Sequence, residues 1–296
     1  MKLIKIFFIT LFTNCCIKAT AQDSSLLKML DDSLTLNHQK IFVHGTFKAT
    51  HIINTQTVEQ PGKKVLEFLI MHRFGQLNQG AYNLFGLDFA TLRLGLNYGL
   101  SDRLSIGIGR SSLDKVADGS IKYKLLRQTE DNSMPVSVNI YSSLAYVTLR
   151  YPADQSYITG QYRMIYTNEF LIARKISPNL SLQLTPLWMH FNLTPTANDK
   201  NDVFALGAGG RIKITKRMSI NAEYNYLLPN QVQSVKVYNS ISGGIDFETG
   251  GHVFQLVFSN SQGMIEPYYL AKTTDSWGKG GIYFGFNISR VFNFKK

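Results

Sequence analysis

Residues 89–110 read FATLRLGLNYGLSDRLSIGIGR, and this stretch decides the fold. Between residues 90 and 99, apolar side chains alternate with Thr, Arg, Gly and Asn, which is the period-two pattern of a β-strand with two different faces. A polar turn at residues 100–103 is followed by a second alternating segment over residues 104–110. We therefore expect two antiparallel strands joined by a tight turn.

A hairpin with one apolar and one polar face fits two classes of protein. In a soluble sheet the apolar face points into the core and the polar face into water. A membrane barrel reverses this arrangement: apolar side chains face lipid, polar or small ones face a wet lumen, and each strand needs only about 9–11 residues. The rest of the chain distinguishes the two classes.

The same alternation recurs from residue 65 to the end of the chain. We count twelve such segments, from 65–74 to 282–294, with long connections expected after the odd segments and short ones after the even segments. The third connection is expected over residues 111–118, and the sixth strand over residues 157–175. Because such lengths are typical of bacterial barrels, we predict an all-β fold: an up-and-down antiparallel transmembrane β-barrel of about 12 strands, monomeric, over residues 65–296.

The amino-terminal segment, residues 1–21, is predicted to be a signal peptide. Lys2 and Lys5 precede an apolar run over residues 6–12, and an Ala-Thr-Ala site ends at residue 21. A lipid-anchored Cys15 or Cys16 is the alternative. Both cysteines of the chain lie here, so the mature protein is expected to contain neither a disulfide nor a thiolate metal site.

Residues 22–64 are predicted to form a short periplasmic or lumen-plugging segment. Leucines at helical spacing over residues 25–36 indicate a short amphipathic helix. The spacing of His38, His44 and His51 fits no closed metal motif, so a solvated or plugging segment is expected here instead of a metal site. No cofactor is expected anywhere in the chain.

Several motifs carry a resemblance to a known family. They are HRFG at 72–75, YNLFGLD at 82–88, GRS at 109–111, DGSIKYK at 118–124, NSQGM at 260–264 and FGFNISR at 284–290. In these residues the chain resembles a Bacteroidota outer-membrane β-barrel family of unknown function, the domain-of-unknown-function family numbered 5777. The resemblance covers nearly all of the mature chain. It implies an outer-membrane barrel and transfers no catalytic residue.

Charged residues on the polar parity are predicted to line the lumen. The candidates are Arg73, Arg93, Lys122, Lys124, Arg163, Glu169, Arg211, Lys213 and Glu223. These charges can form an ion-pair network that stiffens the wall, or their basic surplus can attract anions through a water-filled passage. A twelve-strand lumen is narrow and can be blocked by the amino-terminal segment or by residues 75–88, so an open pore does not follow from the strand count.

Three classes of function are compatible with this pattern. The favoured one is a narrow channel or transporter for small polar or anionic solutes, and the alternative is a non-conducting structural or partner-binding barrel. A surface enzyme such as a lipid hydrolase is the third class, but residues 259–263 (SNSQG) lack the histidine that a Ser-His-Asn nucleophilic site needs. We therefore expect no catalytic residue and no enzyme activity.

The expected location follows from the signal peptide and the barrel. Outer-membrane placement with both termini in the periplasm is predicted, because short turns of such barrels face the periplasm. The expected partners are outer-membrane lipids, a small anionic solute and the barrel-assembly machinery, for which an aromatic final strand ending at Phe294 is a terminal signal. A net charge of +11 without a nucleic-acid motif is attributed to lipid headgroups or a cationic lumen, and no nucleic acid is expected.

Overall fold

The computed structural model describes residues 40–294 of the chain. The predicted signal peptide and the predicted helix at residues 25–36 lie outside the described residues. The chain divides into two units, Met1–Ile41 and Phe42–Lys296, and the second unit contains the whole barrel.

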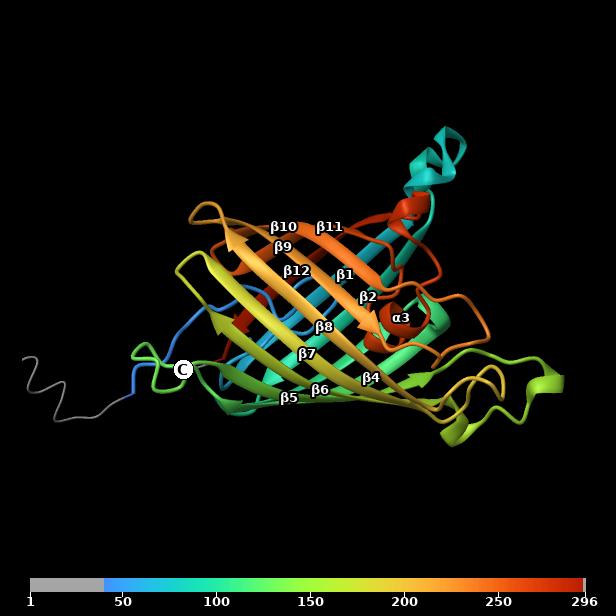
Figure 1. The fold of residues 1–296 in the computed structure, drawn as a ribbon, viewed down its shortest axis with the longest axis horizontal. Helices are drawn as coiled ribbons and strands as arrows, with labels where there is room; N and C mark the ends of the chain where they lie inside the picture. Colours follow the sequence, from blue (N-terminus) through green and yellow to red (C-terminus); the bar gives the residue numbers. More distant parts are fainter. Residues whose placement is uncertain (1–39, 295–296) are drawn as a thin grey trace, which may run out of the picture. The chain divides into compact units, whose positions relative to one another are not determined.

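Twelve antiparallel strands form a closed barrel in which each strand pairs with its neighbours in sequence and β1 pairs with β12 (Figure 1). The strands are β1 (Val65–Gln76), β2 (Ala90–Gly99), β3 (Leu104–Ser111), β4 (Val116–Leu126), β5 (Ser137–Val147), β6 (Met164–Lys175), β7 (Leu180–Phe191), β8 (Asp202–Lys213), β9 (Met218–Leu227), β10 (Ser240–Thr249), β11 (His252–Ser259) and β12 (Tyr283–Asn293). The predicted fold class and strand count are confirmed.

The two faces of the wall differ as the alternation predicts. On β2, Leu92, Leu94 and Leu96 are exposed, whereas Thr91 and Arg93 on the alternate positions are buried. The same alternation of exposed apolar and buried polar residues recurs on β9, where Ile220 and Tyr224 are exposed and Ser219, Asn221 and Glu223 are buried. An apolar surface of this extent is expected to contact lipid. Among residues 40–294, no helix is long and apolar enough to cross a membrane.

The barrel closes at a seam between its first and last strands. Residue pairs run from Val65 with Asn293 to Arg73 with Gly285. A side chain at position 285 would collide with the backbone oxygen of His72 and with the Arg73 side chain, so the close approach requires glycine. On the outer face the His72 and Phe286 rings stack with centroids 4.9 Å apart, which adds a cross-strand contact to the hydrogen-bonded seam.

Two expected boundaries are wrong. β4 begins at Val116, so the connection from β3 to β4 is short and contains only residues 112–115. The connection from β4 to β5, residues 127–136, is long. The expected alternation of long and short connections therefore fails on both sides of β4. Ala117 and Gly119 on the outward parity are small, so the apolar signal is missing. β6 begins at Met164, since Gly160, with φ +52°, starts a 3-10 turn, η5 (Gly160–Arg163), in the preceding loop.

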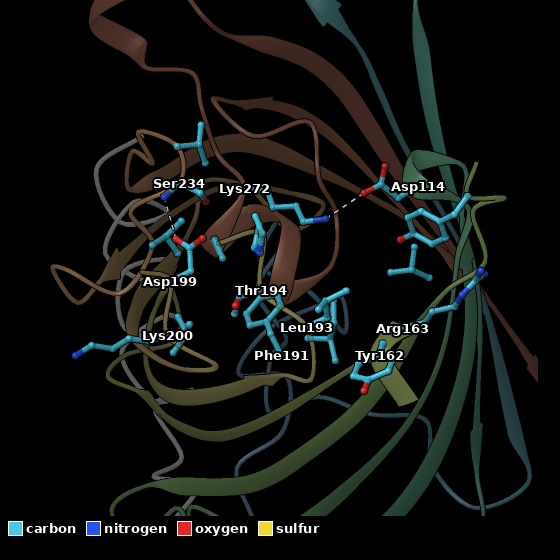
Figure 2. Close-up of a pocket in the computed structure, with 18 residues that line it drawn as sticks. Asp114, Tyr162, Arg163, Phe191, Leu193, Thr194, Asp199, Lys200, Ser234 and Lys272 are labelled. Atoms are coloured by element: carbon cyan, nitrogen blue, oxygen red, sulfur yellow. Dashed lines mark hydrogen bonds and ion pairs between the residues drawn. The ribbon is translucent and has the colours of Figure 1, made fainter. Parts of the chain in front are cut away.

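The tight turns after β2, β6, β8 and β10 lie at one end of the barrel, which we call the short-turn end. The connections after β1, β5, β7, β9 and β11 lie at the opposite, long-loop end, and they contain most of the remaining structure. A short helix, α3 (Glu266–Ala271), lies between β11 and β12, and all of its residues are buried. Beside it the loops enclose a pocket of about 340 Å³ (Figure 2). The connection with η1 (Leu77–Gln79) and η2 (Ala81–Gly86) projects away from the barrel and does not enter the lumen (Figure 1).

Candidate functional site

Residues 46–61, which we call the plug, lie inside the barrel. Every plug residue is buried except Lys48 and Glu59. The plug turns back on itself, because the Ile52 N–H donates to the Thr55 carbonyl and the Thr57 N–H to the Thr50 carbonyl, each at 2.8 Å. Its tip therefore lies at Ile53 and Asn54, deep in the lumen.

The tip is bound by one carboxylate of the wall. Glu223 on β9 accepts hydrogen bonds from the backbone N–H groups of Ile53, Asn54 and Thr55, at 3.1, 3.0 and 3.1 Å. The Glu223 residue is only 3% exposed. Successive N–H groups that converge on one anion form a concave nest, so the acid compensates for its burial by binding backbone dipoles.

Side-chain amides of four other strands bind the plug's backbone. Asn139 on β5 donates to the Val58 carbonyl at 2.8 Å, and Gln183 on β7 donates to the Gln56 carbonyl at 2.6 Å. Gln255 on β11 and Asn287 on β12 donate to the carbonyls of Ile52 and Ile53, both at 2.9 Å. These bonds satisfy backbone groups that would otherwise be buried without partners.

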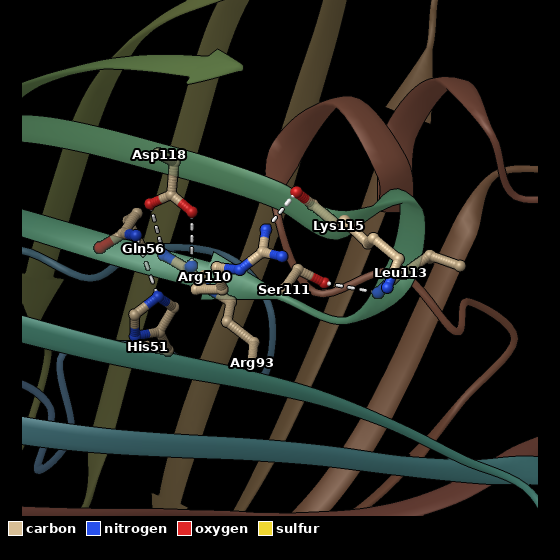
Figure 3. Close-up of polar contacts among 8 residues, drawn as sticks. All are labelled: His51, Gln56, Arg93, Arg110, Ser111, Leu113, Lys115 and Asp118. Atoms are coloured by element: carbon tan, nitrogen blue, oxygen red, sulfur yellow. Dashed lines mark hydrogen bonds and ion pairs between the residues drawn. The ribbon is translucent and has the colours of Figure 1, made fainter. Parts of the chain in front are cut away.

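Lys122 on β4 begins a chain of hydrogen bonds that fixes the state of His51. Its Nζ donates to Oε1 of Gln56 at 2.9 Å, so the Gln56 amide nitrogen must be the donor to Nε2 of His51, also at 2.9 Å. His51, which Figure 3 shows beside Gln56, is therefore neutral, and its Nδ1 lies 3.2 Å from the Thr50 hydroxyl. Burial, reinforced by the charges of Lys122, Arg93 and Arg73, holds the pKa of His51 well below its ordinary value.

Two arginines are bound within the same interior. Arg93 forms a bidentate pair with Asp118, at 2.6 and 2.9 Å, and its guanidinium passes over Gly109 of the intervening strand (Figure 3). A side chain at position 109 would collide with that guanidinium. Arg73 donates to Oδ1 of Asn54 in the plug at 2.8 Å. One arginine therefore joins wall strands and the other joins wall to plug.

The structure places the predicted lumen residues in four different environments. Arg73, Lys122 and Glu223 meet at the plug, and Arg93, Glu169 and Arg211 are also buried inside the wall. Lys124 and Lys213 are half-buried at the short-turn end, where their backbone N–H groups bond to Arg103 and Asn179. Arg163 lies in η5, beside the pocket, and not on a wall strand.

Sequence reasoning missed the neutral residues of the site. Asn139, Gln183, Gln255 and Asn287 carry no charge and were not among the candidates, although each lies on the polar parity of a predicted strand. Within residues 40–294, no cluster of three or more His, Cys, Asp or Glu side chains is arranged to hold a metal ion.

Solved structures that this chain resembles include one porin and two proteins described as outer-membrane proteins. The NanC porin has a TM-score of 0.47 and 8% identity over 78% of this chain and 100% of its own. An outer-membrane channel from Pseudomonas putida F1 has a TM-score of 0.47 and 13% identity, covering 79% and 97%. Omp33 of Acinetobacter baumannii has a TM-score of 0.43 and 8% identity, covering 79% and 100%. At these values the likeness is not informative about function.

The family is given by the sequence itself. No curated protein matches the chain. The family model described as a membrane-bound beta barrel domain (DUF5777) matches residues 47–292, which include most of the plug and nearly the whole wall. The match confirms the family to which the motifs point, while the predicted Bacteroidota origin stays a prediction. The chain belongs to this family of membrane-bound beta barrel domains.

Proposed function

We propose that the protein is an outer-membrane passage for small polar or anionic solutes, and that the plug keeps it closed. One observation carries this proposal: the wall forms a complete ring of paired strands without the plug. β1 pairs directly with β12 and with β2, and residues 46–61 take no part in this ladder. The plug can therefore leave without breaking a backbone hydrogen bond of the wall.

The surface that the plug covers is suited to water. Lys122, Asn139 and Gln183 point to the plug through side-chain nitrogens, and each of these groups can exchange its plug partner for water or a polar solute. A lumen lined by such groups supports passage of polar molecules once it is empty. An apolar lumen would not fill with water as readily.

The charge of the lumen sets the expected selectivity. Two basic residues, Arg73 and Lys122, and two acids, Glu223 and Glu67, bind the plug from the wall. These four charges balance, so the expected basic surplus comes from Lys124 and Lys213, which are half-buried at the short-turn end. A basic surplus in a narrow passage favours anions.

Planar-bilayer conductance tests this function. The variant replaces residues 46–58 by a Gly-Ser segment of equal length, and the control is the unaltered full chain. We expect steady conductance with anion preference from the variant and brief or no openings from the control. Heat-dependent migration on gels establishes that the variant barrel is folded. A folded variant that does not conduct would reject the channel.

A second candidate, a non-conducting structural barrel, rests on a different observation. Phe47, Ile52, Ile53 and Val58 of the plug form a buried apolar cluster with wall residues that include Leu171 and Val257. Such a cluster inside a barrel resembles a domain core, and burying it stabilises the fold. This alternative predicts that the Gly-Ser variant does not fold, whereas the gated passage predicts that it does.

A further inference from the structure

The pocket at the long-loop end is lined mainly by apolar side chains. Its walls come from strand ends, from the loops after β3, β5, β7 and β9, and from the end of α3 (Figure 2). The apolar lining includes Val147, Ile165, Phe191, Leu193, Val203 and Val232. Its volume of about 340 Å³ is near the lower end of the range of ~300–1,000 Å³ for small-molecule sites. The pocket therefore has room for one compact apolar group.

Both acids in the pocket wall are already occupied by the protein. The Asp199 carboxylate accepts bonds from the backbone N–H groups of Gln233 and Ser234, at 2.6 and 2.9 Å, and from Thr196. Burial alone would raise the pKa of Asp199, but these hydrogen bonds hold it below its ordinary value. Asp114 is bound by Lys272 at 3.1 Å (Figure 2) and also accepts a hydrogen bond from the Tyr268 hydroxyl at 2.8 Å.

Arg163 differs from these groups because its charge has no counter-ion. It donates to the carbonyls of Ile158 and Leu149, at 2.7 and 2.9 Å, through Nε and one terminal nitrogen. Its guanidinium also lies 4.8 Å from the centre of the Tyr151 ring. Among residues 40–294, Arg163 takes part in no ion pair. A half-buried cation whose partners are all neutral favours an anion beside it.

The remaining cations of the pocket do not compete for this role. Lys272 is paired with Asp114, and the Lys200 side chain is directed away from the cavity (Figure 2). Asp114 is paired with Lys272 and Asp199 is bound by N–H and hydroxyl donors, so within residues 40–294 Arg163 is the cation beside the cavity that has no acidic partner.

We propose that this pocket binds a small amphipathic carboxylate, with its apolar body against the Phe191 and Val203 side of the cavity and its carboxylate against Arg163. Burial of the body supplies affinity in proportion to its apolar area, and the arginine selects the charge. Because the pocket lies among the loops and not in the plugged lumen, binding does not require conduction. The inference therefore stands apart from the proposed channel.

Calorimetric titration of the full chain in lipid nanodiscs tests the site, with empty nanodiscs to subtract partition into lipid. The probes are 2-naphthoate, the uncharged 2-naphthamide and the cationic 2-naphthylmethylammonium, which share one ring system. We expect naphthoate to bind about tenfold or more tightly than the amide, and the ammonium not to bind. Equal affinity for naphthoate and its amide would overturn the assignment of the anion.

Three variants locate the bound molecule. Arg163→Gln should remove the preference for naphthoate over the amide, and Lys200→Gln, which changes the charge equally, should not. Since Arg163 also anchors its loop, Val235→Trp is an independent variant: Val235 lines the pocket and is 43% exposed, so an indole there fills the cavity without disturbing Arg163. We expect this variant to bind neither naphthalene compound. Naphthoate binding unchanged by Val235→Trp would exclude this pocket. Equal loss of binding in Lys200→Gln and Arg163→Gln would overturn the assignment of the carboxylate to Arg163, because Lys200 also lines the pocket.

Discussion

One carboxylate oxygen of Glu223, on β9, lies 3.0 Å from the backbone nitrogen of Asn54 at the plug tip. The contact joins residues far apart in the chain, and it is buried. Because the carboxylate binds backbone N–H groups, it recognises the shape of the turn and not the identity of its side chains. The tip can therefore be released by a change in the wall alone.

Glu223→Gln should loosen the plug. The amide offers one acceptor oxygen where the carboxylate offers two, and its NH₂ group would face backbone N–H donors, so we expect a loss of about 1–3 kcal/mol in plug binding. Planar-bilayer recordings should show a higher open probability. Glu248→Gln is the matched control, because the Lys48–Glu248 pair is partly exposed and contributes ~0–1 kcal/mol. Similar openings in both variants would contradict a specific role for Glu223.

Lys122 and Lys124 should differ, although the sequence treats them alike. Lys122 Nζ donates to Gln56 and to the carbonyls of Thr57 and Glu59, whereas Lys124 is half-buried at the short-turn end. Lys122→Met should lengthen channel openings, because it leaves several buried acceptors unpaired, and Lys124→Met should not. Single-channel dwell times measure the effect. A shift in reversal potential without longer openings would mean that Lys122 lines an open passage and does not hold the plug.

The wall could be predicted from sequence, but the plug's attachment could not. Period-two alternation over segments such as residues 90–99 indicates both that the segment is a strand and which of its faces contacts lipid. It does so because lipid favours apolar side chains on the outward positions. No such periodicity marks the segment around His51. Its position depends on side chains of strands from β1 to β12, among them Arg73, Lys122 and Asn287, that meet only when the barrel closes. The start of β4 could not be predicted either, because small outward residues such as Gly119 do not produce an apolar alternation.

Acidification should loosen the plug through His51. The buried ring is neutral and its pKa is lowered, whereas the released ring has the ordinary value of about 6.5. The released state therefore binds more protons below pH 6.5, and plug stability should fall by up to ~1.4 kcal/mol per pH unit as the pH falls below that value. Hydrogen exchange of the Ile53–Thr55 amides, corrected for intrinsic rates, measures this loss.

His51→Gln is the control for that titration. Burial raises the pKa of Glu266, in α3, to about 7, so this acid acts with the opposite sign. Its protonated form is favoured in the folded protein, and the stability it contributes at low pH is lost as the pH rises from about 4.5 to about 7. Both proteins contain Glu266, so their difference isolates His51. An identical pH dependence in the two proteins would exclude the histidine.

The outward leucines should be intolerant of charge. Leu94→Arg, at the middle of β2, should reduce the free energy of unfolding by about 2–4 kcal/mol, because the guanidinium would enter the apolar part of the bilayer. Leu100→Arg is a matched control: Leu94 and Leu100 are 41% and 46% exposed, but Leu100 lies in the turn after β2. Urea unfolding in lipid vesicles gives both values. Equal losses would place the bilayer elsewhere on the wall.

The orientation of the barrel can be tested on intact cells. Asn198→Cys and Thr274→Cys, both at exposed positions of the long-loop end, should react with a membrane-impermeant thiol reagent. Lys216→Cys, in the turn between β8 and β9, should react only after the outer membrane is permeabilised. The unaltered chain is the reference for any reaction of Cys15 and Cys16. The opposite labelling pattern would reverse the predicted topology.

The seam between β1 and β12 also constrains the order of assembly. Val65 and Asn293 pair across almost the whole length of the barrel sequence, so this contact has the largest loop-closure cost and forms last. Two of the plug's partners, Gln255 and Asn287, belong to the final two strands. A nascent chain therefore cannot bind its plug fully before its carboxyl-terminal strands have docked. A bound plug indicates that the barrel has closed.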